Sequence, residues 1–196
     1  MTSGRNASTG ATPADLGLAY VVVVHLAPDR KSELRSILSR HTRMPMVQVG
    51  DQREEPLLPD HVYVIAPDRE LLITDSAVGV KPFEQPRGHR MAIDLMFRSL
   101  AEARGEGFAV VFSGTGSDGV AGAKAVKSRG GVILVQEPSS AAYGEMPRAV
   151  IATGLADVVL PVRELARRLA ELARNRPKLL PMLDADTGPE AVAESR

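Results

Sequence analysis

Three side chains at predicted turns have the residue types of a serine hydrolase. His25 directly follows the valine-rich run of residues 19–24, and Asp118 lies in a glycine-rich turn at residues 114–119. Ser8 lies upstream, in a segment rich in serine, threonine and glycine. A serine nucleophile needs a neutral imidazole to take its proton and a carboxylate to hold that imidazole in the correct tautomer. These residues therefore predict a Ser-His-Asp site in the chain order Ser8, His25, Asp118.

Each of these residues also has a structural interpretation. An aspartate between a strand and a helix is often a helix N-cap, which would explain Asp118 without any chemistry. A histidine after a buried strand is often a loop residue, and a serine in a polar arm is usually solvated. The segment around Ser8 also matches the G-x-S-x-G elbow of serine hydrolases only in part, because Asn6 replaces the first glycine.

The glycine turn is open to a second functional interpretation. Gly114, Gly116 and Gly119 match the G-x-G-x-x-G fingerprint of dinucleotide-binding folds, and Glu137 follows near the end of the next predicted strand. Asp118 weakens this interpretation, because its carboxylate would repel a pyrophosphate that approaches the turn. A nucleotide-binding α/β domain stays an alternative.

The composition predicts one globular domain in the cytoplasm. The chain has 196 residues, 44% of them hydrophobic, and 24 basic residues balance 24 acidic ones, which argues against a nucleic-acid partner. The absence of cysteine excludes disulfides and thiolate sites. No apolar run approaches a membrane span, and the first residues lack the apolar region of a signal peptide. The four histidines are too dispersed for a metal site, so neither a metal nor a cofactor is expected.

Strands and helices alternate along the chain and must position these residues. Buried strands are predicted at residues 19–24, 108–112, 132–135 and 157–160. Amphipathic helices are predicted between them, and the last should begin at Pro161 and end at Pro177. Shorter strand-like segments, separated by turn residues, predict an antiparallel meander at residues 46–49, 62–66, 71–74 and 78–81.

The expected fold class is therefore α/β, with a doubly wound, mostly parallel sheet and a short antiparallel meander. In such folds the site lies at the carboxyl ends of the strands. We expect residues 1–18 to form an irregular arm, residues 19–175 the domain, and residues 176–196 a flexible tail or linker.

Several further motifs follow one another along most of the chain. They comprise Val24-His25-Leu26-Ala27-Pro28, Pro59-Asp60-His61-Val62-Tyr63, His89-Arg90, Ile93-Asp94-Leu95-Met96-Phe97-Arg98-Ser99-Leu100, Ser113-Gly114-Thr115-Gly116-Ser117-Asp118-Gly119, Gln136-Glu137-Pro138, and Gly144-Glu145-Met146-Pro147-Arg148. Together these motifs resemble the catalytic domain of the CheB family, the chemotaxis protein-glutamate methylesterases. Residues 40–45 and Thr115 are most similar to CheB domains that are fused to a CheR-type methyltransferase.

This resemblance implies a mechanism and a substrate. It assigns Ser8 as the nucleophile, His25 as the general base and Asp118 as the carboxylate that orients it, with the turn at Thr115 and Gly116 near the oxyanion. The implied reaction is hydrolysis of glutamate methyl esters on methyl-accepting chemoreceptors, with glutamine deamidation as a related activity. The implied partners are these receptors and a CheR-type methyltransferase.

The amino-terminal region departs from the family pattern. In the family a strand precedes the nucleophile and a helix follows it, and residues 9–18 are too few for such a crossover. Three interpretations are open: a shortened amino terminus, a pseudoenzyme, or an arm that brings Ser8 to His25. A non-catalytic receptor-binding or scaffold module with the same fold is therefore the main alternative to an enzyme.

Overall fold

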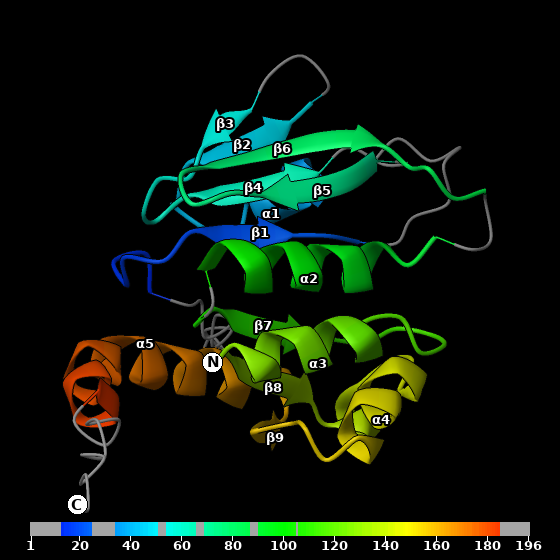
Figure 1. Cartoon of the computed structure of the whole chain (residues 1–196), viewed down its shortest axis with the longest axis vertical. Helices are drawn as coiled ribbons and strands as arrows, with labels where there is room; N and C mark the ends of the chain where they lie inside the picture. Colours follow the sequence, from blue (N-terminus) through cyan, green and yellow to red (C-terminus); the bar gives the residue numbers. More distant parts are fainter. Residues whose placement is uncertain are drawn as a thin grey trace, which may run out of the picture.

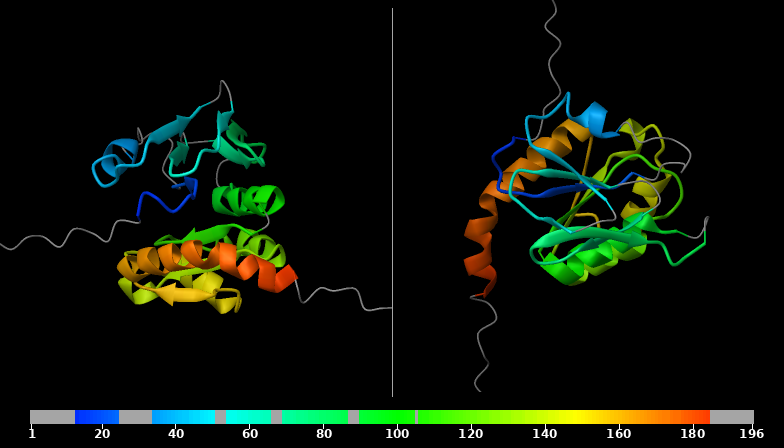
Figure 2. Two further views of the ribbon diagram at one scale, coloured as in Figure 1. Left: turned by 90° about the vertical axis from the view of Figure 1, so that its left-hand side faces the viewer. Right: turned by 90° about the horizontal axis from the view of Figure 1, so that it is seen from above.

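The computed structural model describes residues 13–24, 34–50, 54–65, 69–86, 90–104 and 106–184. Its elements form two groups that lie on either side of α2 (Ala92–Arg104), as Figure 1 and the left view of Figure 2 show. The first group contains β1 (Tyr20–Val22), α1 (Leu34–Leu38), β2 (Met46–Val49), β3 (Glu55–Pro56), β4 (Val62–Ile65), β5 (Arg69–Ile73) and β6 (Ala77–Pro82). The second contains β7 (Phe108–Val111), α3 (Val120–Ser128), β8 (Val132–Gln136), the 3-10 turn η1 (Pro138–Ser140), α4 (Glu145–Ala152), β9 (Val158–Leu160) and α5 (Val162–Asp184).

In the first group, β4 is the middle strand of a parallel sheet with the order β1-β4-β2. Val62 of β4 is in register with Tyr20 of β1 and with Met46 of β2. All residues of β4 are buried, as expected for a central strand that is covered on both faces. The prediction that residues 46–49 and 62–66 belong to an antiparallel meander was therefore wrong. Helix α1 lies between β1 and β2, and β3 lies between β2 and β4. Such a crossover connection lets the next strand run parallel to the previous one.

The antiparallel part of the fold is a second three-stranded sheet with the order β3-β6-β5. β5 and β6 form a hairpin in which Ile73 pairs with Val78 and Leu71 pairs with Val80. Thr74 closes the turn, because its N–H donates to the carbonyl of Ala77 at 2.9 Å. The predicted meander is thus confirmed for residues 71–74 and 78–81.

The second group is built on a parallel sheet with the order β7-β8-β9. Ala109 of β7 pairs with Ile133 of β8, and Val135 of β8 pairs with Val159 of β9. The prediction of an α/β fold with mostly parallel strands is confirmed. Among the described strands, however, the parallel ones divide between two sheets of three and do not form one sheet.

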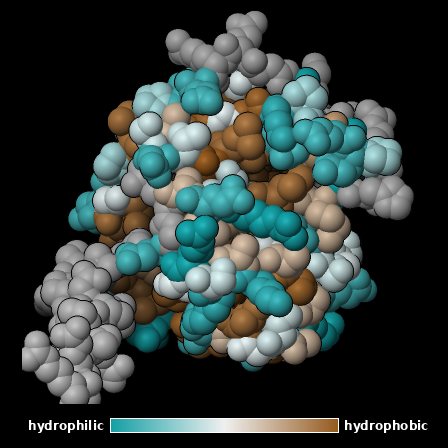
Figure 3. All heavy atoms as spheres, viewed as in Figure 1, coloured by the Kyte–Doolittle hydropathy of each residue, from teal (hydrophilic) through white to brown (hydrophobic). Residues whose placement is uncertain are grey.

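Helix α2 belongs to both hydrophobic cores. Phe97 is buried in the core of the second group, and Met96 and Leu100 pack against the cores of both groups. The polar face of α2 carries the exposed residues Arg98 and Glu102, and hydrophilic atoms form a band over this helix in Figure 3. The position of α2 fixes the second group relative to the first.

Helix α5 is longer than predicted from the sequence. It runs from Val162 to Asp184, so Pro177 does not end it. The φ angle of proline is close to the helical value, so a helix can continue through a proline at the cost of one backbone hydrogen bond and a kink. In the described part of the chain, no helix combines the length and the apolar character that a membrane span requires.

Candidate functional site

The glycine-rich turn that follows β7 contains Asp118. The arrows of β1 and β7 point the same way in Figure 1, so both strands have their carboxyl ends on the same side of the molecule. Gly116 and Gly119 have φ angles of +73° and +96°, which a residue with a side chain rarely adopts. These two glycines let the chain reverse within a few residues between β7 and α3, and the reversal places Asp118 opposite the first turn of α2.

The carboxylate of Asp118 caps α2. Its Oδ2 accepts a hydrogen bond from the N–H of Ile93 at 3.1 Å, and its Oδ1 accepts one from the N–H of Asp94 at 2.9 Å. These N–H groups are among the four at a helix start that have no partner within the helix. Asp118 was interpreted as a possible N-cap of the helix that follows it, but the N-cap of α3 is Gly119, and Asp118 caps α2 instead.

Two opposing effects act on the pKa of Asp118. Burial raises the pKa of this carboxyl above its usual value, and the nearby negative charge of Asp94 acts in the same direction. The hydrogen bonds from the N–H groups of Asp94 and Ile93 oppose this rise, but burial is the larger effect. A carboxylate has about four acceptor positions, so Asp118 keeps acceptor capacity beyond its two bonds to α2. It can therefore accept a further hydrogen bond, such as one from an imidazole.

Asp94 is a second capping residue, a role that was not predicted from the sequence. It is buried, and its Oδ1 accepts a hydrogen bond of 2.6 Å from the N–H of Gly122 in the first turn of α3. A Cβ on Gly122 would lie 2.6 Å from the Cβ of Phe97, so α2 and α3 approach closely only because this residue is glycine. The only sequence signal is an aspartate in the first turn of a helix.

The segment of residues 143–146 holds the first half of the glycine turn. The N–H of Tyr143 donates to Ser113 Oγ at 2.9 Å, and the N–H of Gly114 donates to the carbonyl of Tyr143 at 2.9 Å. The N–H of Met146 donates to the carbonyl of Gly114 at 3.0 Å. A Cβ on Gly114 would lie 2.5 Å from Cε of Met146, so a larger residue here would displace the end of the Met146 side chain.

The glycine turn is also bonded to the side chain of Glu145, the first residue of α4. The N–H of Gly116 donates to Oε2 of Glu145 at 3.0 Å. Thr115, between these two held positions, is exposed, and within the described residues its N–H has no hydrogen-bond partner. An unpaired backbone N–H in an exposed turn can stabilise an oxyanion, provided that the other reacting groups are nearby.

Two of the predicted catalytic residues are not placed by the structure. Ser8 and His25 lie outside the described residues, whereas Thr115, Gly116 and Asp118 lie together in one turn. The carboxylate of Glu145 bonds the N–H of Gly116 in this turn, and that of Asp94 bonds the N–H of Gly122 at the start of α3. This disfavours the nucleotide-binding alternative, because a pyrophosphate would need such N–H groups free. The described residues contain no cluster of three or more His, Asp or Glu side chains that could hold a metal.

Comparisons with known proteins identify the family. Residues 8–169 match the family model described as CheB methylesterase. The chain is 36% identical over 172 residues to a protein-glutamate methylesterase/protein-glutamine glutaminase of Nocardioides, and 32% identical over 184 residues to one from Pseudomonas aeruginosa. These matches cover 85% and 87% of this chain but only 46% and 52% of those relatives.

Two further matches extend this result. The crystal structure of the Thermotoga maritima CheB methylesterase catalytic domain has a TM-score of 0.75 and 27% identity, and the match covers 84% of this chain and 88% of that one. An uncharacterized 104.1 kDa protein of Rhodobacter capsulatus is 38% identical over 147 residues, which cover 74% of this chain and 15% of that protein. The chain belongs to the CheB methylesterase family, and it spans about half or less of the length of these curated relatives.

Proposed function

We propose that this chain is a protein-glutamate methylesterase domain that acts through Ser8, His25 and Asp118. The family supports the reaction, because relatives carry the name protein-glutamate methylesterase/protein-glutamine glutaminase. The observation that carries the proposal is the position of Asp118. Its carboxylate lies in the turn after the carboxyl end of β7, is held by two backbone N–H groups of α2, and keeps capacity for an imidazole N–H.

The proposed reaction proceeds in two steps. Ser8 Oγ attacks the carbonyl carbon of a glutamate methyl ester while His25 takes the hydroxyl proton, and the N–H of Thr115 stabilises the oxyanion. The C–O bond to the methoxy group then breaks, His25 returns the proton, and methanol leaves. Water hydrolyses the acyl-enzyme through the same groups and releases glutamate. A glutamine side chain would follow the same route and release ammonia.

The proposed partner is a methylated chemoreceptor in the cytoplasm, and family membership supports it. A CheR-type methyltransferase, which would form the ester that this reaction consumes, is a second proposed partner. One observation favours the alternative of a non-catalytic receptor-binding module. Asp118 caps α2, so the fold has a use for this carboxylate even without turnover.

Methanol release from a methylated receptor tests the proposed function. We expect release by the wild-type chain and at least about a 1,000-fold loss in His25→Ala, since removal of one triad member has effects of this size. His41→Ala is the matched control, because His41 is an exposed histidine of the described region and should keep wild-type activity. A serine-directed phosphonate should label Ser8. Receptor binding without methanol release or labelling would instead establish the scaffold module.

A further inference from the structure

Thr115 lies between two peptide groups that are both held by the start of α4. The N–H of Met146 donates to the carbonyl of Gly114, which belongs to the peptide group on the amino side of Thr115. Oε2 of Glu145 accepts from the N–H of Gly116, which belongs to the peptide group on its carboxyl side. Consecutive residues of α4 therefore fix both peptide planes at Thr115.

These two bonds determine where the N–H of Thr115 points. In a trans peptide group the C=O and the N–H point in opposite directions. Because the carbonyl of Gly114 points at the N–H of Met146, the N–H of Thr115 points away from the start of α4. The bond from the N–H of Gly116 to Glu145 restrains the peptide group between Thr115 and Gly116. A rotation of that group would otherwise shift Thr115 and its N–H.

We infer that Glu145 is a positioning residue whose carboxylate orients the Thr115 amide for catalysis. This inference rests on the proposed function, in which that amide binds the oxyanion. Glu145 does not touch the substrate in this scheme and acts only through the turn. Such a donor stabilises the transition state only when it is held in place before the reaction begins.

The position of Glu145 distinguishes this role from a general helix effect. A carboxylate in the first turn of a helix is favoured by the helix dipole wherever the helix lies. Glu164 is the corresponding residue of α5: it is exposed, lies in the first turn, and its carboxylate makes no hydrogen bond to the glycine turn in the described part of the chain. Replacing Glu164 therefore removes the same helix effect and leaves the turn untouched.

The test compares Glu145→Ala, Glu145→Gln and Glu164→Ala in the full chain, with methanol release from methylated receptor as the readout. We expect kcat of Glu145→Ala to fall about tenfold while KM changes less than about twofold, because a transition-state contact is weakened and ground-state binding is not. Glu145→Gln should restore most of kcat, since its side-chain oxygen can still accept from Gly116. Glu164→Ala should match the wild-type chain.

Amide hydrogen exchange gives a readout that does not depend on activity. The amide of Gly116 should exchange about tenfold faster in Glu145→Ala than in wild type, and at the wild-type rate in Glu164→Ala. An active wild-type chain in which Glu145→Ala keeps its kcat, or in which Gln fails to restore it, overturns this inference alone. A wild-type chain without turnover overturns the proposed function and this catalytic role together. An unchanged exchange rate at Gly116 shows that Glu145 does not hold the turn.

Discussion

Asp94 and Asp118 cap the amino termini of each other's helices. Asp118, just before α3, accepts hydrogen bonds from two N–H groups in the first turn of α2, and Asp94 of that turn accepts one from Gly122 in α3. The carboxylate proposed to orient the general base is thus part of the contact between two helices. Changes that loosen this contact should affect both stability and the site.

Removing the Asp94 carboxylate tests this reciprocal capping. Asp94→Ala leaves the buried N–H of Gly122 without a partner, so we expect the free energy of unfolding to fall by about 1–3 kcal/mol. Glu102→Ala is the control, because Glu102 is an exposed acidic residue of the same helix. Urea unfolding of both variants measures the difference. Equal stability of the two variants would show that the bond from Asp94 to Gly122 contributes nothing.

Stability should depend on pH through Asp118. Burial raises the pKa of this carboxyl, so the folded protein binds its proton more tightly than the unfolded chain does. The stability that this proton contributes is fully present below the unfolded pKa and is lost as the pH rises through the folded pKa. Asp118→Asn cannot ionise. The free energy of unfolding of the wild type minus that of Asp118→Asn should therefore fall as the pH rises from below the ordinary pKa of an aspartate to neutral pH.

Urea unfolding of both proteins across this pH range measures the difference. A difference that increases with pH would mean that the N–H groups of Ile93 and Asp94, rather than burial, dominate the pKa of Asp118. The fold of the variant is checked by its circular dichroism at each pH.

The close approach of α2 and α3 requires glycine at position 122. In Gly122→Ala the new Cβ would lie 2.6 Å from Cβ of Phe97 and 2.8 Å from the carbonyl oxygen of Asp94, so the helices must move apart. We expect a loss of about 1–3 kcal/mol in the free energy of unfolding. Gly50→Ala is the matched control, because a Cβ there meets nothing within 4 Å. The prediction is wrong if both variants have the same melting temperature.

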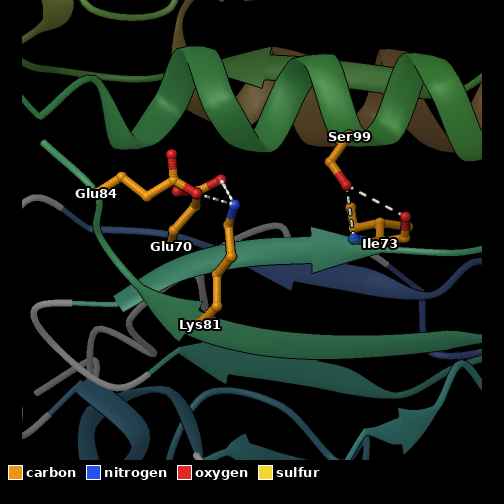
Figure 4. A network of polar contacts seen from close by, with 5 residues as sticks. All are labelled: Glu70, Ile73, Lys81, Glu84 and Ser99. Atoms are coloured by element: carbon orange, nitrogen blue, oxygen red, sulfur yellow. Dashed lines mark hydrogen bonds and ion pairs between the residues drawn. The ribbon is translucent and has the colours of Figure 1, made fainter.

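Ser99 joins α2 to the edge of the antiparallel sheet. Its Oγ accepts from the N–H of Ile73 at 2.6 Å and donates to the carbonyl of the same residue at 3.2 Å (Figure 4). Ser99→Ala removes both bonds, and we expect the free energy of unfolding to fall by about 1 kcal/mol or more. Ser128→Ala removes a single exposed bond within α3 and should cost less. Chemical unfolding of the two variants decides whether Ser99 stabilises this contact.

The local features of the site were predictable from the sequence. The apolar run of β7, the glycine spacing after it and the position of Asp118 are all signals between near neighbours in the chain. The directions of β2 and β4 were not predicted. The four residues of β2 give no clear signal, whereas the continuous apolar run of β4 is typical of a parallel strand, and the turn residues on either side of it led to the wrong prediction. The capping role of Asp94 and the contact of Glu145 with Gly116 join residues 28 and 29 positions apart, and no local pattern marks them.

The two halves of the molecule share one helix. Met96 and Leu100 pack against both hydrophobic cores, so if α2 melted, apolar surface would be exposed to water on both sides at once. Neither half can therefore open alone at low cost, and the domain should lose its structure in a single cooperative transition. The amides in the middle of α2 would then be among the last in the protein to exchange with deuterium.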